Sequence, residues 1–121
     1  MILADTSVWV NHLRRADHDL ARMLQAESVG LHPFILGELA AGNLRNRARV
    51  LSYFTSLPEL AIAPENEVHY LLQSRRLWGS GLGWIDLHIL TATKLSGWDL
   101  YTADHAMNEA AVRLQIRRVP L

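Results

Sequence analysis

The sequence predicts an α/β fold with one mostly parallel sheet of about 4–5 strands and helices on both faces. Short apolar runs, such as Ile2–Ala4 and Leu100–Thr102, have the length and composition of buried parallel strands. Segments with apolar residues at helical spacing lie between these runs, so strands and helices alternate. The chain has 121 residues, of which 50% are hydrophobic, which suits one core. We therefore expect residues 1–121 to form a single domain.

Each element expected in the first half follows from a local pattern. The strand Ile2–Ala4 ends at Asp5, and Ser7 is well placed to cap the helix after it. Asp17 is the expected cap of a helix that reaches Ala26. The next elements are a strand over 29–31, a helix from Pro33 to about Gly42 and a helix opened by Asn46 that runs through Phe54.

In the second half, prolines and glycines mark the boundaries of the elements. Pro58 and Pro64 bound an expected strand over 60–63, and Gly97 stops a helix over 84–96. A glycine-rich stretch over 79–83 precedes that helix. The other expected elements are a helix over about 66–78, a strand over 100–102, a helix over about 105–114 and a final strand over 117–119.

Composition excludes several classes of protein. The absence of cysteine rules out disulfides, thiolate zinc sites and a cysteine nucleophile, and it suits a reducing cytosol. The N-terminal residues lack the pattern of a signal peptide, and no apolar run approaches the ~18 residues that a membrane span needs. We therefore expect a soluble, cytoplasmic protein with no membrane partner.

Basic and acidic residues number 12 each, so the formal net charge is zero and nucleic-acid binding would depend on local patches. All the basic residues except Lys94 are arginines, and several of these are clustered. A solvated helix face explains any single cluster, but such clusters also suit a nucleic-acid backbone or an acidic partner. The clusters are Arg14 and Arg15; Arg45, Arg47 and Arg49; Arg75 and Arg76; and Arg117 and Arg118.

Four acidic residues stand where strands end or helices begin. Asp5 and Asp104 each follow a predicted strand, so both are expected at the same edge of a parallel sheet, where ligands bind in such folds. Asp86 falls in the first turn of its helix, and Glu38 lies about a turn and a half into another. We expect the four carboxylates to converge, and their repulsion at close range favours a bound divalent cation.

Carboxylate ligands without cysteine or a histidine motif favour Mg²⁺, with Mn²⁺ as the alternative, over Zn²⁺. Such an ion can activate a water for attack on phosphorus and neutralise the charge that develops on phosphate oxygens. Hydroxyls beside the acids are expected to orient the carboxylates or hold a water. These hydroxyls belong to Thr6, Ser7 and Thr102.

Each acid also has a purely structural explanation. Asp5 can cap a helix, Asp104 can be a turn residue, and Asp86 is favoured near the positive end of a helix. Glu38 is the hardest to explain in this way, because its neighbours make that helix mostly apolar.

In order and spacing, the stretches around these acids resemble PIN domains, and most closely the VapC toxins of toxin–antitoxin pairs. The matching stretches are Leu3–Ser7, Gly37–Leu39, Trp84–Leu90 with Ala92 following, and Leu100–Asp104.

The resemblance implies a Mg²⁺-dependent endoribonuclease that hydrolyses RNA phosphodiester bonds and is held inactive by a VapB-like antitoxin. It also implies a homodimer. By the same resemblance, Asp5 and Asp86 are the firmest metal ligands, and Glu38 and Asp104 complete the catalytic pocket.

The alternative function is a catalytically inactive PIN-like scaffold that binds protein or RNA without cutting it. The four acids argue against a scaffold, because a binding module gains nothing from concentrated repulsive charge. The 6 histidines share no metal-ligand spacing, and most are expected at the surface. Trp9 and Trp78, if exposed, would mark a surface for a partner.

Overall fold

The computed structural model describes residues 1–120, and its centre is a parallel sheet of three short strands. The strands are β1 (Ile2–Ala4), β2 (Val29–Gly30) and β3 (Asp99–Tyr101), in the order β2-β1-β3. Ala4 pairs with Tyr101 at the carboxyl ends of β1 and β3. The residues that follow these strands, Asp5 and Thr102, are therefore neighbours at one edge of the sheet.

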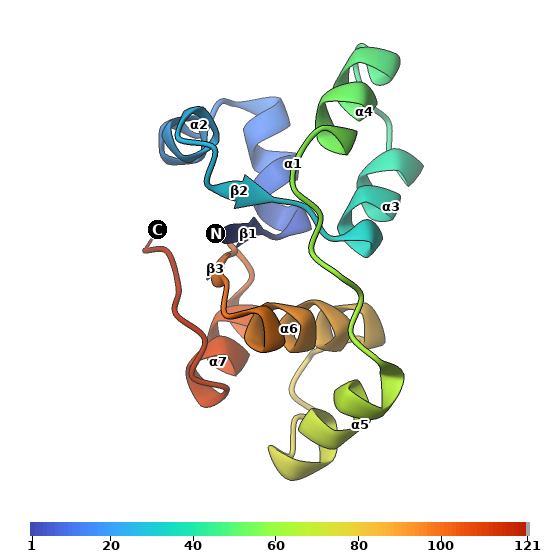
Figure 1. Cartoon of the computed structure of the whole chain (residues 1–121), viewed down its shortest axis with the longest axis vertical. Helices are drawn as coiled ribbons and strands as arrows, with labels where there is room; N and C mark the ends of the chain where they lie inside the picture. The colour runs from blue at the N-terminus through green and yellow to red at the C-terminus, as the bar shows by residue number, and fades with distance from the viewer. Residues whose placement is uncertain (121) are drawn as a thin grey trace.

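Helices cover the sheet on two sides. Figure 1 shows α1–α4 on one side of the sheet and α5–α7 on the other. This arrangement confirms the predicted α/β class. The helices are α1 (Thr6–Arg14), α2 (His18–Gln25), α3 (Pro33–Ala41), α4 (Arg47–Thr55), α5 (Glu65–Ser74), α6 (Trp84–Ser96) and α7 (His105–Arg113).

The two outermost expected strands are reduced to single parallel bridges. Leu31 pairs with Glu59, and Leu100 pairs with Arg118, so the expected strands over 60–63 and 117–119 do not form in the described part of the chain. Proline limits the first ladder: Leu31 donates its N–H to the Pro58 carbonyl, and the next backbone nitrogen on that side belongs to Pro33, which has no N–H. The sheet thus has three strands with a parallel bridge on each side.

Helix α6 forms the centre of the core on its side of the sheet. A continuous run of its residues, Leu87–Thr93, is buried, which is typical of a helix surrounded by other elements. Two threonines in this run satisfy their hydroxyls within the helix: Thr91 donates to the carbonyl of Leu87 at 2.7 Å, and Thr93 to that of Ile89 at 2.6 Å. Within residues 1–120, no helix combines the length and the hydrophobicity that a membrane crossing requires.

The cap of α1 differs from the prediction. Asp5, not Ser7, precedes the helix, and its carboxylate accepts the backbone N–H of Thr6. Asp5 has the extended backbone that a capping residue requires, whereas Ser7 is already in the first turn of the helix. The other predicted cap is confirmed: Asp17 accepts the N–H of Leu20 at 3.0 Å at the start of α2.

Candidate active site

Asp5 occupies the centre of the candidate site, directly after β1. The residue is 7% exposed. One carboxylate oxygen accepts the N–H of Thr6, and the other accepts the hydroxyl of Thr102, both at 2.6 Å. Because these donors come from the start of α1 and the end of β3, the orientation of the carboxylate is fixed from two sides.

Burial raises the pKa of Asp5, because ionisation inside the protein loses hydration. The hydrogen bonds from Thr102 and Thr6 oppose this rise, whereas the negative charges of Asp86 and Asp104 add to it. The repulsion shows that Asp86 and Asp104 lie within electrostatic range of Asp5. These two acids come from the starts of α6 and α7.

Asp86 and Asp104 each make a capping hydrogen bond as well. Asp86 accepts the N–H of Gly83 at 3.0 Å, and Asp104 accepts the N–H of Met107 at 3.0 Å. Asp86, Asp104 and Asp5 therefore all help to cap a helix, which is a purely structural role. It does not exclude a shared edge of the sheet, because α7 begins directly after β3 and the charge of Asp86, at the start of α6, acts on Asp5.

Glu38 joins the cluster through Thr6. The Thr6 hydroxyl donates to Glu38 Oε1 at 2.7 Å, while the Thr6 N–H binds Asp5. Glu38 is exposed, although its neighbour Leu39 is buried. The apolar neighbours of Glu38 thus belong to other faces of α3, and its side chain lies at the surface beside Thr6.

Thr102 and Ser7 connect the loop after β3 to the start of α1. The Thr102 hydroxyl donates to Asp5 and accepts the N–H of Asp104 at 3.0 Å, and the Ser7 hydroxyl accepts the N–H of Ala103 at 3.1 Å. Asn108 was not predicted from the sequence, and its side-chain N–H₂ donates to the Thr102 carbonyl at 3.1 Å. Its position one helical turn after Asp104 is the signal that would have indicated it.

The chemistry of the donor set fits a hard divalent cation, because every candidate ligand is a carboxylate. Within residues 1–120, however, no three acidic or histidine side chains stand close enough together to share an ion as they are. Like charges repel, and the capping N–H groups draw Asp86 and Asp104 toward their own helices. Each of these two carboxylates uses one oxygen in the cap, which leaves its second oxygen for another partner.

Two of the six histidines are buried, whereas the other four are exposed or partly exposed, in line with the prediction that most lie at the surface. His32 and His88 have exposures of 0% and 3%, and Phe34 packs between their rings at centroid distances of 5.0 and 5.1 Å. Burial, together with the neighbouring His88, lowers the pKa of His32 to about 4, so the ring is neutral at physiological pH. A neutral imidazole ring can pack in a hydrophobic core. A prediction that treats histidine as a polar residue does not place it there.

The two tryptophans considered as surface markers differ. Trp9 is 1% exposed and packs edge-to-face against Phe54, so it belongs to the core. Trp78 is 57% exposed, after the end of α5.

The PIN-domain family matches residues 2–113 of the chain. The chain belongs to this family. It is also 40% identical over 111 residues to ribonuclease VapC32 from two strains of Mycobacterium tuberculosis, covering 91% of this chain and 90% of each relative. The prediction of a PIN domain of the VapC type is therefore confirmed.

Solved structures support the fold independently. A chain of FitAB bound to an IR36 DNA fragment matches with a TM-score of 0.68 at 16% identity, covering 98% of this chain and 94% of that one. PAE2754 from Pyrobaculum aerophilum matches with a TM-score of 0.59 at 20% identity, covering 94% and 96% of the two chains. At these identities the likeness is one of fold.

Proposed function

We propose that this protein is a metal-dependent endoribonuclease and the toxin of a toxin–antitoxin pair. The observation that supports the proposal is the buried carboxylate of Asp5, which Thr102 and Thr6 hold at the sheet edge, which feels the charges of Asp86 and Asp104, and which Thr6 links to Glu38. The 40% identity to proteins named as VapC32 ribonucleases supports the choice of RNA as substrate.

Asp5, Glu38, Asp86 and Asp104 are the residues that would hold Mg²⁺ or Mn²⁺. When bound, the cation supplies Lewis acidity, a more acidic water and charge neutralisation at phosphate oxygens. The hydroxyl of Thr102 holds Asp5 in one orientation, and that of Thr6 does the same for Glu38. Because both carboxylates are oriented before substrate arrives, little reorganisation remains for the reaction itself.

The direct test is cleavage of a pool of cellular RNA by the purified wild type and by Asp5→Asn. Each is incubated with Mg²⁺, with Mn²⁺ and with EDTA, and the cut ends are sequenced. We expect cuts that need a divalent cation and disappear in the variant. Equal cutting by folded Asp5→Asn would contradict the assigned site, and cutting in EDTA would contradict the metal.

The toxin role has a separate test. Expression is expected to arrest growth of a bacterial host, and a VapB-like protein encoded beside this one is expected to relieve the arrest by binding the toxin. Asp86→Asn serves as the matched control, because it removes one carboxylate charge from the cluster. Harmless expression of an active ribonuclease would contradict the toxin role and leave the enzymatic role intact.

A scaffold that binds protein or RNA without cutting is the second candidate. The two functions predict different thermal shifts, because a ligand that binds the folded state raises its melting temperature. An enzyme of the proposed kind is stabilised by Mg²⁺ or Mn²⁺, and Asp5→Asn is stabilised less. No shift in either protein, together with RNA binding and no cleavage, would favour the scaffold.

A further inference from the structure

A groove of about 650 Å³ lies beside the acidic cluster. It is bordered by α1, by α3 and by the connection between α3 and α4, and its lining includes Glu38, Arg14 and Arg45. Glu38 is also the residue that Thr6 links to Asp5. A molecule that fills the groove is therefore in contact with one member of the cluster.

The two arginines of the groove have no anionic partner in the part of the chain that the structure describes. Arg22 and Arg117 form ion pairs with Asp19 and Asp99, whereas neither Arg14 nor Arg45 forms an ion pair or donates a side-chain hydrogen bond within residues 1–120. Both are exposed. An exposed guanidinium without a carboxylate beside it is available for an external anion.

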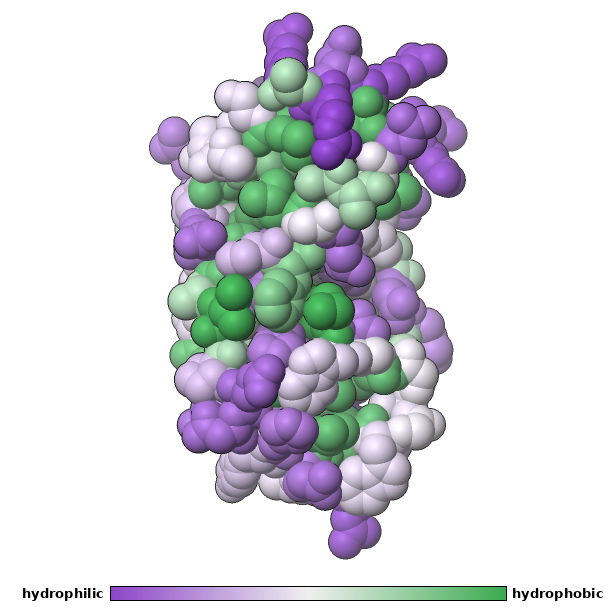
Figure 2. Space-filling model, turned by 90° about the vertical axis from the view of Figure 1, so that its right-hand side faces the viewer, coloured by the Kyte–Doolittle hydropathy of each residue, from purple (hydrophilic) through white to green (hydrophobic). Residues whose placement is uncertain are grey.

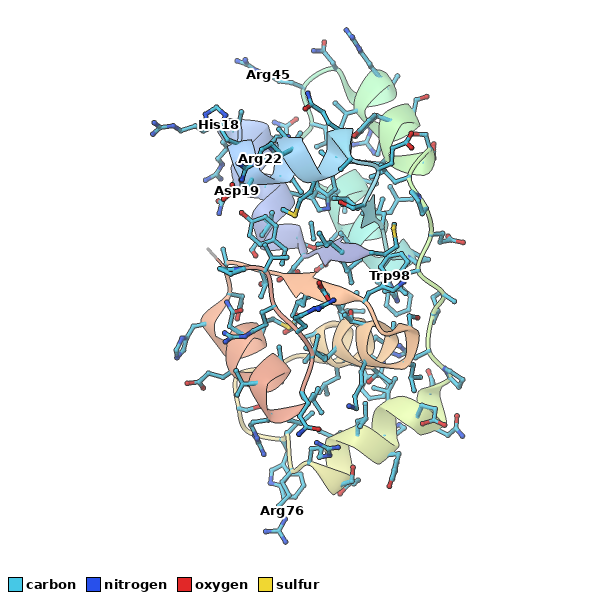
Figure 3. All side chains as sticks on the ribbon, turned by 60° about the vertical axis from the view of Figure 1, so that its left-hand side comes forward. His18, Asp19, Arg22, Arg45, Arg76 and Trp98 are labelled. Atoms are coloured by element: carbon cyan, nitrogen blue, oxygen red, sulfur yellow. The ribbon has the colours of Figure 1, made fainter. Side chains whose placement is uncertain are left out.

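Further positive charge surrounds this end of the molecule. Arg47 and Arg49 lie in the first turn of α4, next to the groove, and are exposed. Figure 2 shows strongly hydrophilic side chains over the end of the molecule where α4 begins, and in Figure 3 Arg45 projects from that end. Since the formal net charge is zero, this is a local concentration of charge and not a property of the whole surface.

We propose that the groove holds the single-stranded RNA next to the scissile bond, with Arg14 and Arg45 as positioning residues on its phosphates. The apolar lining, which includes Leu39 and Leu44, offers a surface for an unpaired base. The inference rests on the proposed function, because it assigns the path by which the substrate of that site arrives. It adds two residues that lie outside the acidic motifs.

Charge and position favour RNA over a protein segment as the occupant. A polyanion gains from guanidinium groups along its path, and its phosphates must approach the carboxylate cluster for the proposed chemistry to occur. An acidic, apolar peptide would also fit the lining, but nothing requires it to reach Glu38. Binding of such a peptide instead of RNA is therefore an outcome that the test must detect.

The test compares Arg14→Gln and Arg45→Gln with Arg14→Lys, Arg45→Lys and a control, Arg76→Gln. Arg76 is exposed, and Figure 3 shows it at the opposite end of the molecule from Arg45. The substrate is a short single-stranded RNA that contains a cut site mapped with the wild type. Cleavage gives kcat and KM, and fluorescence anisotropy in EDTA gives binding as a function of salt.

We expect each glutamine variant to raise KM about 5–10-fold with kcat changed by less than about twofold. The slope of log K against log salt is expected to fall by about 0.7 for each lost phosphate contact. The lysine variants recover most of the wild-type KM, and Arg76→Gln matches the wild type. Equal melting temperatures verify that the variants are folded.

Failure of this inference is distinguishable from failure of the proposed function. Wild-type KM and salt slope in both glutamine variants, with an active wild type, would overturn the groove assignment alone. If the glutamine variants lost binding to the co-encoded antitoxin while their RNA binding was unchanged, the assignment would also be overturned, because the occupant of the groove would then be protein. A wild type that neither binds nor cuts RNA would overturn the function and the inference together.

Discussion

The hydroxyl of Tyr101 donates to the carboxylate of Asp17 across a distance of 2.5 Å, joining the end of β3 to the start of α2. Asp17 also caps α2 through the N–H of Leu20, and its own N–H donates to His12 Nδ1 at 2.9 Å. The connection between α1 and α2, which follows Arg14, is therefore attached to the strand that ends beside Thr102.

Tyr101→Phe is expected to lower the free energy of unfolding by about 1–2 kcal/mol, because it removes a hydrogen bond to a charged group. Tyr101 is buried, so water does not readily replace the lost donor. Urea unfolding measures the change. Tyr53→Phe is the control, since Tyr53 is 45% exposed and its hydroxyl has no hydrogen bond within residues 1–120. Equal losses in the two variants would contradict this assignment.

The same pair predicts a pH dependence of stability. Burial alone would raise the pKa of Asp17, but the hydrogen bonds from Tyr101 and from the backbone lower it below its ordinary value of 3.8. When the pKa of an acid is lower in the folded protein than in the unfolded chain, its ionised form stabilises the fold. This stabilisation is complete at a pH above the unfolded-state pKa, and it is lost as the pH falls through the folded-state pKa. The difference in stability between wild type and Tyr101→Phe should therefore shrink below about pH 4. A difference that stays constant to pH 2 would contradict the coupling.

Asp5→Asn is expected to raise the melting temperature near pH 7.5 while reducing cleavage at least about 100-fold. Because burial raises the pKa of Asp5 in the folded protein, the fold loses stability as the pH rises through that pKa and the carboxylate ionises. Asparagine carries no charge and therefore avoids this loss. Asparagine keeps an acceptor for Thr102. Asp19→Asn, an exposed residue outside the site, serves as the control. A lower melting temperature for Asp5→Asn would show that its charge is stabilising.

Thr6→Val is expected to reduce cleavage about 10-fold, because it removes the hydroxyl that orients Glu38. The backbone N–H of Thr6 still binds Asp5, so the central carboxylate stays in place. Thr6→Ser retains the hydroxyl and is expected to stay near wild-type activity. Equal activity in the valine and serine variants would exclude an orienting role for this hydroxyl.

Gly30→Ala is expected to destabilise the protein by about 2 kcal/mol. A Cβ at Gly30 would overlap the ring of Trp98, labelled in Figure 3, and would lie 2.7 Å from the Pro58 carbonyl oxygen. Gly37→Ala is the control: a Cβ there meets nothing within 4 Å, and alanine in a helix is expected to add about 0.5–1 kcal/mol. Both values come from chemical denaturation, and a neutral Gly30→Ala would show that Trp98 can move aside.

Element order and the shared edge of Asp5 and Asp104 were predictable because both follow from local patterns and one topological rule, whereas a metal site made by the four acids stays a prediction. Asp17 was recognised as a cap from its neighbours alone, and β1 and β3 were recognised as short apolar runs. Parallel strands then imply that Asp5 and Asp104 share an edge. Whether these acids act on RNA is tested by the variants above and not by the fold.

What could not be predicted depends on partners distant in sequence. The segment over 60–63 has an apolar composition, but Ala61 and Ile62 are exposed, and the parallel bridge forms just before the segment, between Glu59 and Leu31. Ser7 was expected to cap the helix because a local pattern cannot show that its hydroxyl accepts the N–H of Ala103, 96 residues later. The bond between Thr6 and Glu38 is equally invisible in a local pattern.

The central position of β1 has a consequence for synthesis of the protein. Asp5 is synthesised before Thr102, which lies 97 residues later and orients the buried carboxylate of Asp5. Strand β1 likewise acquires its second neighbour only when β3 is available. A nascent chain that stops short of β3 thus lacks the pairing of β1 with β3 and the hydrogen bond that orients Asp5, so the site can be assembled only after Thr102 has been translated.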